Sequence, residues 1–181
     1  MRIESTPRFA NFDQDDIDVA IRVGDGRWPG LKSTELFAIA GMPVATRSFV
    51  TAQRIRKPDD LVNTRLIHDA AQPRAWRVWL AAQDAGERDE SGDLWFDSAP
   101  ATLQAAEQNL GVALGIDPLV RLWPGFGERL RQTFPGASGP RTRYWIVRRH
   151  EFDADPKIKA FIAWVRAACR ALEVKEVAAG I

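Results

Sequence analysis

The side chains that most often carry catalysis are scarce in this chain. It has two histidines, His68 and His150, and one cysteine, Cys169, among 181 residues. No H-x-x-x-H or C-x-x-C spacing is present, which excludes the common zinc sites. No G-x-S-x-G segment presents a serine nucleophile, and Cys169 lies in an apolar stripe typical of a packed thiol. The sequence therefore predicts no enzyme, no metal centre and no cofactor.

A glycine-rich stretch, G-D-G-R-W-P-G at residues 24–30, raises the question of a phosphate loop. A phosphate site of that type needs the amides of a helix N-terminus directly after the glycines. Here the third glycine of the fingerprint is missing, and Trp28 and Pro29 lead into another strand-like run. We therefore predict a sharp turn between two strands, without a bound nucleotide.

Polar side chains at the ends of short strands are better candidates for ligand contacts. His68 and Asp69 follow the run R-L-I-H, and Asp97 and Ser98 follow D-L-W-F and precede an alanine-rich helix at 101–109. The carboxyl ends of strands are where α/β sheets place ligand groups, and free amides at a helix start favour anions. A surface or capping role for His68 and a simple N-cap role for Ser98 remain open alternatives.

A third candidate group follows the strand predicted at 35–45. Arg47, flanked by Thr46 and Ser48, is suited to bidentate pairing with a carboxylate. The four arginines of R-T-R-Y-W-I-V-R-R-H at 141–150, by contrast, are interpreted as a solvated strand border, because no helix accompanies them to enter a DNA groove. The net charge of +1 also argues against nucleic-acid binding as a property of the whole chain.

The remaining composition predicts a globular protein of the cytoplasm. No apolar run approaches the roughly 20 residues that span a bilayer, and the polar, acidic N-terminus is unlike a signal peptide. A single cysteine cannot form an intramolecular disulfide. These features indicate a reducing compartment and no membrane contact.

Strands and helices alternate along the chain, which predicts an α/β fold with a mainly parallel sheet. In the last helix, apolar residues recur at helical spacing from Ile158 to Leu172. The expected strands are 16–23, 35–45, 65–68, 93–96, 111–116 and 142–149, and the expected helices are 58–63, 73–86, 101–109, 118–125 and 156–174.

The order of these pieces resembles the effector-binding domain of LysR-type transcriptional regulators, most closely the glycine-cleavage-activator-like branch. The stretches that carry the resemblance are FDQDDIDVAIRVGDGRWPGL, ELFAIAGMPVATRSF, KPDDLVNTRLIH, WRVWLAA, LWFDSAPATLQAAEQNLGVALG and DPKIKAFIAWVRAA. They occur in family order and cover nearly the whole chain. The first and fifth are the more specific ones, whereas the last is a generic amphipathic helix.

The resemblance implies a type II periplasmic-binding-protein-like fold, with two Rossmann-like lobes joined by two crossover strands and a small effector between them. Lobe one would comprise 1–42 plus 139–181, and lobe two 43–138. The family's effector contacts would fall on the seven residues Thr46, Arg47, Ser48, His68, Asp69, Asp97 and Ser98. The Ser-Pro that usually follows the crossover in this family is replaced by Thr46-Arg47.

The resemblance also implies that the first strand and helix of lobe one, the helix-turn-helix and the linker helix are missing, so that DNA binding would require a domain absent from this chain. We expect an effector-sensing domain that binds a small anionic or amino-acid-like ligand and forms a homodimer that covers the exposed sheet edge. The alternatives are a solute-binding protein of the same fold class and a truncated remnant that acts only as a dimerisation module.

Overall fold

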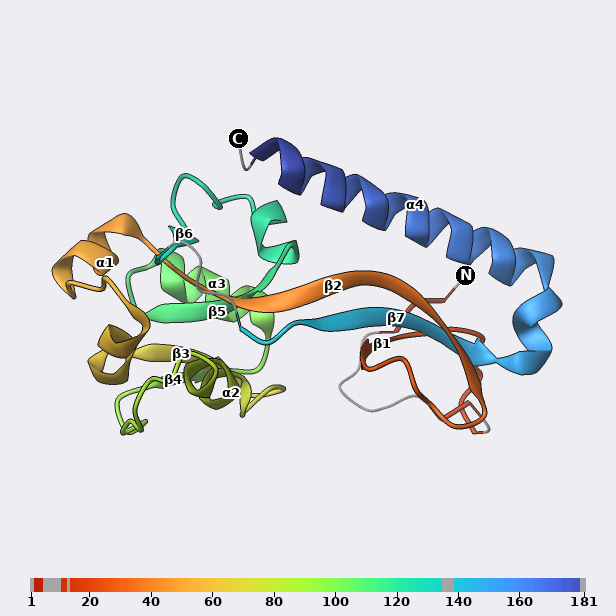
Figure 1. The fold of residues 1–181 in the computed structure, drawn as a ribbon, viewed down its shortest axis with the longest axis horizontal. Helices are drawn as coiled ribbons and strands as arrows, with labels where there is room; N and C mark the ends of the chain where they lie inside the picture. The colour runs from red at the N-terminus through yellow and green to blue at the C-terminus, as the bar shows by residue number, and fades with distance from the viewer. Residues whose placement is uncertain (1, 5–10, 13, 135–138, 180–181) are drawn as a thin grey trace. The chain divides into compact units, whose positions relative to one another are not determined.

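The computed structural model describes residues 2–4, 11–12, 14–134 and 139–179, with side chains up to residue 170. The elements are β1 (Ala20–Gly24), β2 (Leu31–Ala45), α1 (Arg47–Ala52), η1 (Pro58–Asn63), β3 (Leu66–Asp69), α2 (Ala75–Ala81), β4 (Leu94–Phe96), α3 (Ala99–Glu107), β5 (Val112–Asp117), η2 (Leu119–Leu122), β6 (Arg131–Gln132), β7 (Thr142–Arg149), η3 (His150–Ala154) and α4 (Pro156–Ala179). Helices and strands alternate from β3 to β6, whereas β1 is followed directly by β2, and β6 by β7 (Figure 1).

The chain divides into two compact units. The first unit comprises Met1–Ile39 and Thr142–Ile181, and the second comprises Ala40–Arg141. The division therefore falls after residue 39 and before residue 142, whereas the sequence analysis placed it after 42 and before 139. The long strand β2 starts in the first unit and ends in the second, as expected for a crossover strand.

The first unit is built on three antiparallel strands and one long helix. Strand β7 lies between β1 and β2, and it pairs with both in antiparallel register. The side chains of Ile158, Ile162, Val165 and Cys169 are buried on α4, which confirms the predicted apolar stripe as far as the described side chains extend. Cys169 is thus a packed thiol.

The glycine-rich stretch forms the connection between β1 and β2, as the sequence predicts. Gly26 and Gly30 both adopt positive φ values, 85° and 73°, which β-carbon-bearing residues rarely tolerate. The indole of Trp145 packs against this turn and donates a hydrogen bond from Nε1 to the carbonyl oxygen of Gly24 at 3.0 Å. No helix begins here, and the turn serves to position strands.

The second unit contains a sheet in the order β2-β5-β3-β4, with β6 also paired to β2. Strand β3 runs parallel to both β4 and β5, whereas β2 is antiparallel to β5. The prediction of a mainly parallel sheet is therefore wrong. Among the strands of the described residues, the parallel ladders join β3, β4 and β5, which are connected through α2 and α3, whereas the crossover strands β2 and β7 pair antiparallel with their neighbours.

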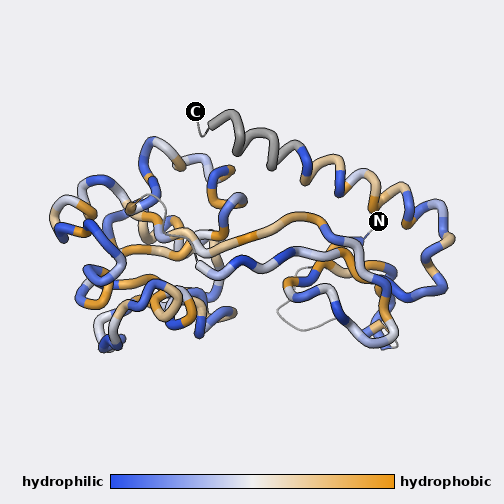
Figure 2. Tube along the Cα trace, in the orientation of Figure 1, coloured by the Kyte–Doolittle hydropathy of each residue, from blue (hydrophilic) through white to orange (hydrophobic). Residues whose placement is uncertain are grey.

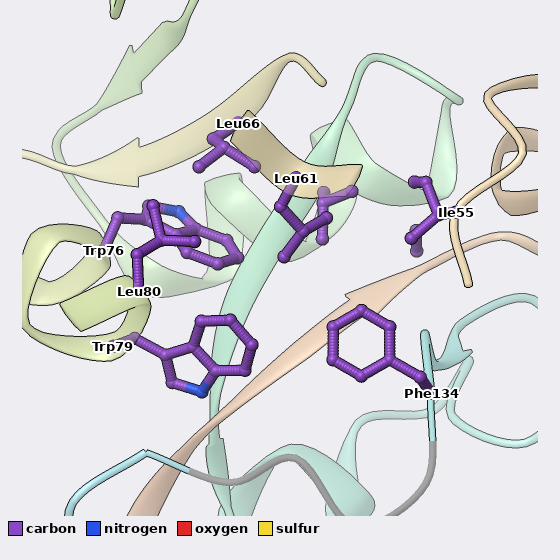
Figure 3. Close-up of a cluster of buried hydrophobic side chains, with 9 residues drawn as sticks. Ile55, Leu61, Leu66, Trp76, Trp79, Leu80 and Phe134 are labelled. Atoms are coloured by element: carbon purple, nitrogen blue, oxygen red, sulfur yellow. The ribbon is translucent and has the colours of Figure 1, made fainter. Parts of the chain in front are cut away.

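The sheet of the second unit separates two apolar clusters, and strand alternation assigns neighbouring residues to opposite faces. Leu66 belongs to the cluster with α2, and Ile67 belongs to the cluster with α3. Strand β5 is buried on both faces and is apolar along much of its length (Figure 2). Figure 3 shows the first cluster, in which the indoles of Trp76 and Trp79 face Leu61, Leu66 and Phe134.

Burying two indoles requires partners for their N–H groups, and the backbone supplies them. Trp76 donates to the carbonyl oxygen of Ile67 at 2.9 Å, and Trp79 donates to that of Gly41 at 3.1 Å. Each indole therefore links α2 to a different strand of the sheet, and its buried N–H group has a hydrogen-bond acceptor. This explains why two of the seven tryptophans occur three residues apart on one short helix.

Three short elements were not expected from the sequence. They are α1, β6 and η3, with six, two and five residues respectively. Helix α1 begins after Thr46, whose hydroxyl accepts a hydrogen bond from the amide of Phe49 at 3.1 Å. Elements this short carry too few residues for apolar periodicity to reveal them. Within the described residues, no helix is both long and apolar enough to cross a membrane.

Candidate functional site

Two of the predicted ligand-binding segments meet at the carboxyl ends of β3 and β4, which we call the carboxyl edge of the second unit. The register places Asp69 opposite Phe96, so Asp97 and Ser98 follow directly after this pair. The amide of Ala70 donates to the carbonyl oxygen of Phe96 at 2.7 Å, which ties the two chain segments together just beyond the strands.

The carboxyl edge also contains the start of α3. Ser98 is the N-cap residue in an extended conformation, and its side chain makes no capping hydrogen bond. Pro100 has no amide hydrogen, so the first turn offers the N–H groups of Ala99 and Ala101. The Asp97 side chain is exposed, and Asp69 uses one carboxylate oxygen to accept from the amide of Ala71 at 2.9 Å. Hydroxyl, amides and carboxylates are thus presented together.

The third predicted segment lies elsewhere. The Thr46 hydroxyl is bonded to Oδ1 of Asn109, and the Ser48 hydroxyl donates to the same oxygen at 2.9 Å. Asn109 follows the end of α3 with a positive φ of 61°, a conformation that asparagine adopts more readily than most residues. These contacts join the start of α1 to the end of α3. The side chain of Arg47 is exposed.

Strand register shows that the two groups occupy opposite ends of the sheet. Ala40 pairs with Asp117 at the carboxyl end of β5, whereas Val44 pairs with Ala113 near its amino end. Thr46 continues past Val44, and β5 is parallel to β3. Thr46, Arg47 and Ser48 therefore lie at the amino ends of the parallel strands, and the structure does not bring them together with the carboxyl edge.

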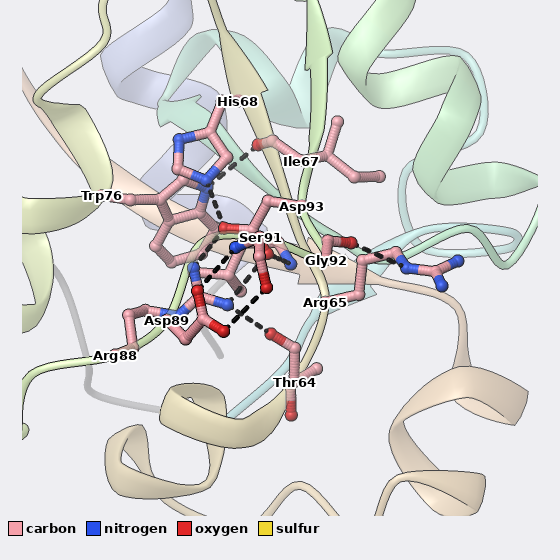
Figure 4. A network of polar contacts seen from close by, with 11 residues as sticks. Thr64, Arg65, Ile67, His68, Trp76, Arg88, Asp89, Ser91, Gly92 and Asp93 are labelled. Atoms are coloured by element: carbon pink, nitrogen blue, oxygen red, sulfur yellow. Dashed lines mark hydrogen bonds and ion pairs between the residues drawn. The ribbon is translucent and has the colours of Figure 1, made fainter.

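His68 is part of a buried polar network rather than an open surface (Figure 4). Its Nε2 lies 2.7 Å from Oδ2 of Asp93, and its ring stacks on Trp95 with centroids 4.1 Å apart. Arg88 pairs with both oxygens of Asp93 and donates to the carbonyl oxygen of Thr64 at 2.9 Å. Asp93 also accepts from the amide of Leu66 at 3.0 Å.

The electrostatics of this network keep Asp93 ionised. Burial alone would raise the pKa of the Asp93 carboxyl, but hydrogen bonds from Arg88, the Leu66 amide and His68 outweigh burial and hold the pKa below its ordinary value. An ionised carboxylate is the acceptor that a buried guanidinium requires. The network thus connects the amino ends of β3 and β4 through charge-assisted hydrogen bonds.

Sequence reasoning missed three residues of these polar clusters: Arg88, Asp93 and Asn109. Arg88 lies in the charged run E-R-D-E, which is typical of a solvated loop, and its partner cannot be identified without the register of β3 and β4. Asn109 carried a usable signal, because asparagine is common directly after a helix. Among the described residues, no group of three or more His, Cys, Asp or Glu side chains could hold a metal ion.

Comparison with known proteins assigns the family. A sequence model of the LysR substrate binding domain matches residues 2–170. The chain belongs to the LysR substrate-binding domain family. The resemblance found in the sequence is confirmed, and with it the α/β fold of the periplasmic-binding-protein-like, two-lobed type.

Characterised relatives are transcriptional regulators. The glycine cleavage system transcriptional activator of Escherichia coli K12 is 30% identical over 177 residues, which is 97% of this chain and 57% of the activator. The HTH-type transcriptional activator AmpR of Citrobacter koseri is 25% identical over 91% of this chain and 55% of its own length. The chain thus spans little more than half the length of these relatives.

Solved structures of the same fold include two AmpR domains. The effector domain of AmpR from Pseudomonas aeruginosa superimposes with a TM-score of 0.75 at 23% identity, covering 97% of this chain and 84% of that one. The effector binding domain of AmpR from Citrobacter freundii gives 0.71 at 22% identity, covering 92% and 81%. At this identity the likeness shows the fold alone.

Proposed function

We propose that this chain is the effector-sensing part of a LysR-type transcriptional regulator and binds a small amino-acid-like ligand at the carboxyl edge. The observation that carries the proposal is the Ser98 hydroxyl, an N-cap side chain without a capping hydrogen bond beside two carboxylates. Most N-cap hydroxyls satisfy a helix amide. A hydroxyl and amides left without such a bond favour a ligand carboxylate.

The charges at the carboxyl edge favour a zwitterion over a simple anion. Asp69 and Asp97 would repel a ligand that carried only a carboxylate, but they would attract an ammonium group. An amino acid supplies both groups on one carbon. In this arrangement its carboxylate accepts from Ser98 and the amides of Ala99 and Ala101, while its ammonium donates to the aspartates.

A screen of ligands and two aspartate variants tests the proposal. The 20 amino acids, their deaminated acids and their decarboxylated amines would be compared by thermal shift and calorimetry. We expect at least one amino acid to bind more tightly than either analogue. Asp97→Asn should weaken that binding about tenfold, because it removes one charge-assisted hydrogen bond. Asp84→Asn, an exposed aspartate with a φ of 54° that asparagine tolerates, is the matched control.

The other members of the predicted site keep distinct roles within this proposal. His68 supports the sheet below the carboxyl edge through Asp93 and Trp95, and we propose it as a positioning residue. Thr46, Arg47 and Ser48 stay a prediction from the sequence that the proposed site at the carboxyl edge does not use, and both of their hydroxyls already bond to Asn109. If Arg47→Ala weakens amino-acid binding as strongly as Asp97→Asn does, the ligand site would have to include the amino ends of the strands.

We also propose that the protein forms a homodimer and acts in the cytoplasm without intrinsic catalysis. In this proposal, DNA is bound through a helix-turn-helix domain outside this chain. Within the described residues β1 pairs only with β7, and its Ile21 and Val23 side chains are 53% and 44% exposed. An apolar edge strand of this kind favours association with another copy. Light scattering at several protein concentrations tests the dimer, and a monomer mass throughout would contradict it.

A further inference from the structure

A polar depression lies in the first unit, between α4 and the strands β2 and β7. It has a volume of about 520 Å³, and its walls come from β2, β7, η3 and α4. We call its polar lining residues the basic pocket; they are Thr34, Arg148, His150, Asp153, Lys159 and Arg166. All seven residues of the predicted effector site belong to the other unit.

The acidic side chain in the basic pocket is already neutralised. Arg148 is 7% exposed and donates to the hydroxyl oxygen of Thr34 at 3.0 Å and to a carboxylate oxygen of Asp153. Lys32 pairs with the other oxygen of Asp153. These two hydrogen bonds lower the pKa of Asp153 to about 2. Its negative charge is therefore balanced by two cations and offers little opposition to an anion.

Further positive charge faces the pocket from one side of α4. Lys159 and Arg166 are seven residues apart and lie on the same helix face as the pocket residue Ile162. Across the part of the chain that the structure describes, neither cation makes a side-chain hydrogen bond or ion pair. Because Thr34 accepts from Arg148 through its oxygen, its hydroxyl hydrogen is available to a ligand.

We propose that the basic pocket binds a small phosphate-bearing anion. A phosphate carries between one and two negative charges near neutral pH and accepts several hydrogen bonds, which matches flexible cations beside a hydroxyl. Lys159 and Arg166 pair with the phosphate oxygens, Thr34 donates from the strand side, and His150 adds a further donor. The inference is independent of the amino-acid site, because the two sites belong to different units.

Calorimetry of the whole chain at constant ionic strength tests the pocket, with inorganic phosphate and glycerol 3-phosphate as probes. We expect saturable binding of at least one probe, and the double variant Lys159→Gln/Arg166→Gln should weaken it by about tenfold or more. The matched control is Lys157→Gln/Arg170→Gln, which changes the same number of charges on the same helix outside the pocket. It should alter the affinity by less than about twofold, since more distant exposed charges are screened.

The relative strength of the two probes distinguishes free phosphate from a phosphate ester. Tighter binding of glycerol 3-phosphate would indicate that the ligand extends beyond the phosphate group, and equal binding would indicate recognition of phosphate alone. Circular dichroism of each variant verifies folding. The proposal is overturned if neither probe binds saturably to the wild-type chain, or if the control pair weakens binding as much as the pocket pair.

Discussion

The Nε2 atom of His68 lies 2.7 Å from Oδ2 of Asp93, and the two side chains are only 2% and 1% exposed. One residue belongs to β3 and the other directly precedes β4, so the contact joins the two parallel strands on the side of their amino ends, opposite to the carboxyl edge. Arg88 completes the link from the loop between α2 and β4. The geometry at Asp69, Asp97 and Ser98 depends on how firmly these strands are held.

Replacing Asp93 should therefore destabilise the second unit strongly. Asp93→Asn leaves the buried guanidinium of Arg88 without its carboxylate, and we expect a loss of about 3 kcal/mol in the free energy of unfolding. Asp89→Asn is the control, because Asp89 is exposed and, among the described residues, its carboxylate hydrogen-bonds to Ser91; its effect on the free energy of unfolding should be small beside that of Asp93→Asn. Urea denaturation measures both. Similar losses for the two variants would show that the network carries little stability.

Stability should also fall in acid through Asp153. Its pKa is lowered from 3.8 to about 2 by hydrogen bonds from Lys32 and Arg148. A carboxyl whose pKa is lower in the folded than in the unfolded state stabilises the fold fully at pH values above its unfolded-state pKa. This stabilisation is lost as the pH falls towards its folded-state pKa. The melting temperature, measured between pH 5 and pH 2, should therefore fall less steeply in Asp153→Asn than in the wild type. The difference should appear from about pH 4 downward. Parallel profiles would contradict this origin of acid sensitivity.

Two glycines of the turn between β1 and β2 should respond differently to alanine. Both have positive φ, but a β-carbon on Gly26 would lie 2.7 Å from the Trp145 ring, whereas nothing lies within 4 Å of one on Gly30. Gly30→Ala should cost about 1 kcal/mol from backbone strain alone. Gly26→Ala should cost roughly 3 kcal/mol, because steric overlap adds to the strain. Chemical denaturation compares them, and equal costs would mean that the Trp145 ring yields freely.

Much of the fold is encoded locally, and those parts were predictable. The spacing of Ile158, Ile162, Val165 and Cys169 defined the buried face of α4, and the glycines at 24–30 identified a turn. The alternation of strands and helices between residues 65 and 117 correctly indicated α/β units. Short-range periodicity and turn chemistry suffice for these features, because each depends on residues near one another in the chain.

The arrangement of the polar clusters was not predictable in the same way. His68 meets Asp93 across 25 residues, and Thr46 meets Asn109 across 63, so both contacts depend on strand order and register. The direction in which β2 runs also determines where Thr46 lies. Because β2 pairs antiparallel with β5, Thr46 lies at the opposite end of the sheet from Asp69 and Ser98. Local sequence patterns show which residues lie at the ends of strands, but they do not show which strand ends lie next to each other in the fold.

The most direct test of the proposed effector site compares two serine variants. Ser98 lies at the carboxyl edge, and Ser48 bonds to Asn109 at the opposite end of the parallel strands. The probe is the amino acid that gives the largest thermal shift in the screen, titrated by calorimetry. We predict that Ser98→Ala weakens binding by about five- to tenfold, the loss of one hydrogen bond to a charged group, while Ser48→Ala leaves the affinity unchanged. Unchanged affinity in Ser98→Ala, or a larger loss in Ser48→Ala, would contradict a site at the carboxyl edge.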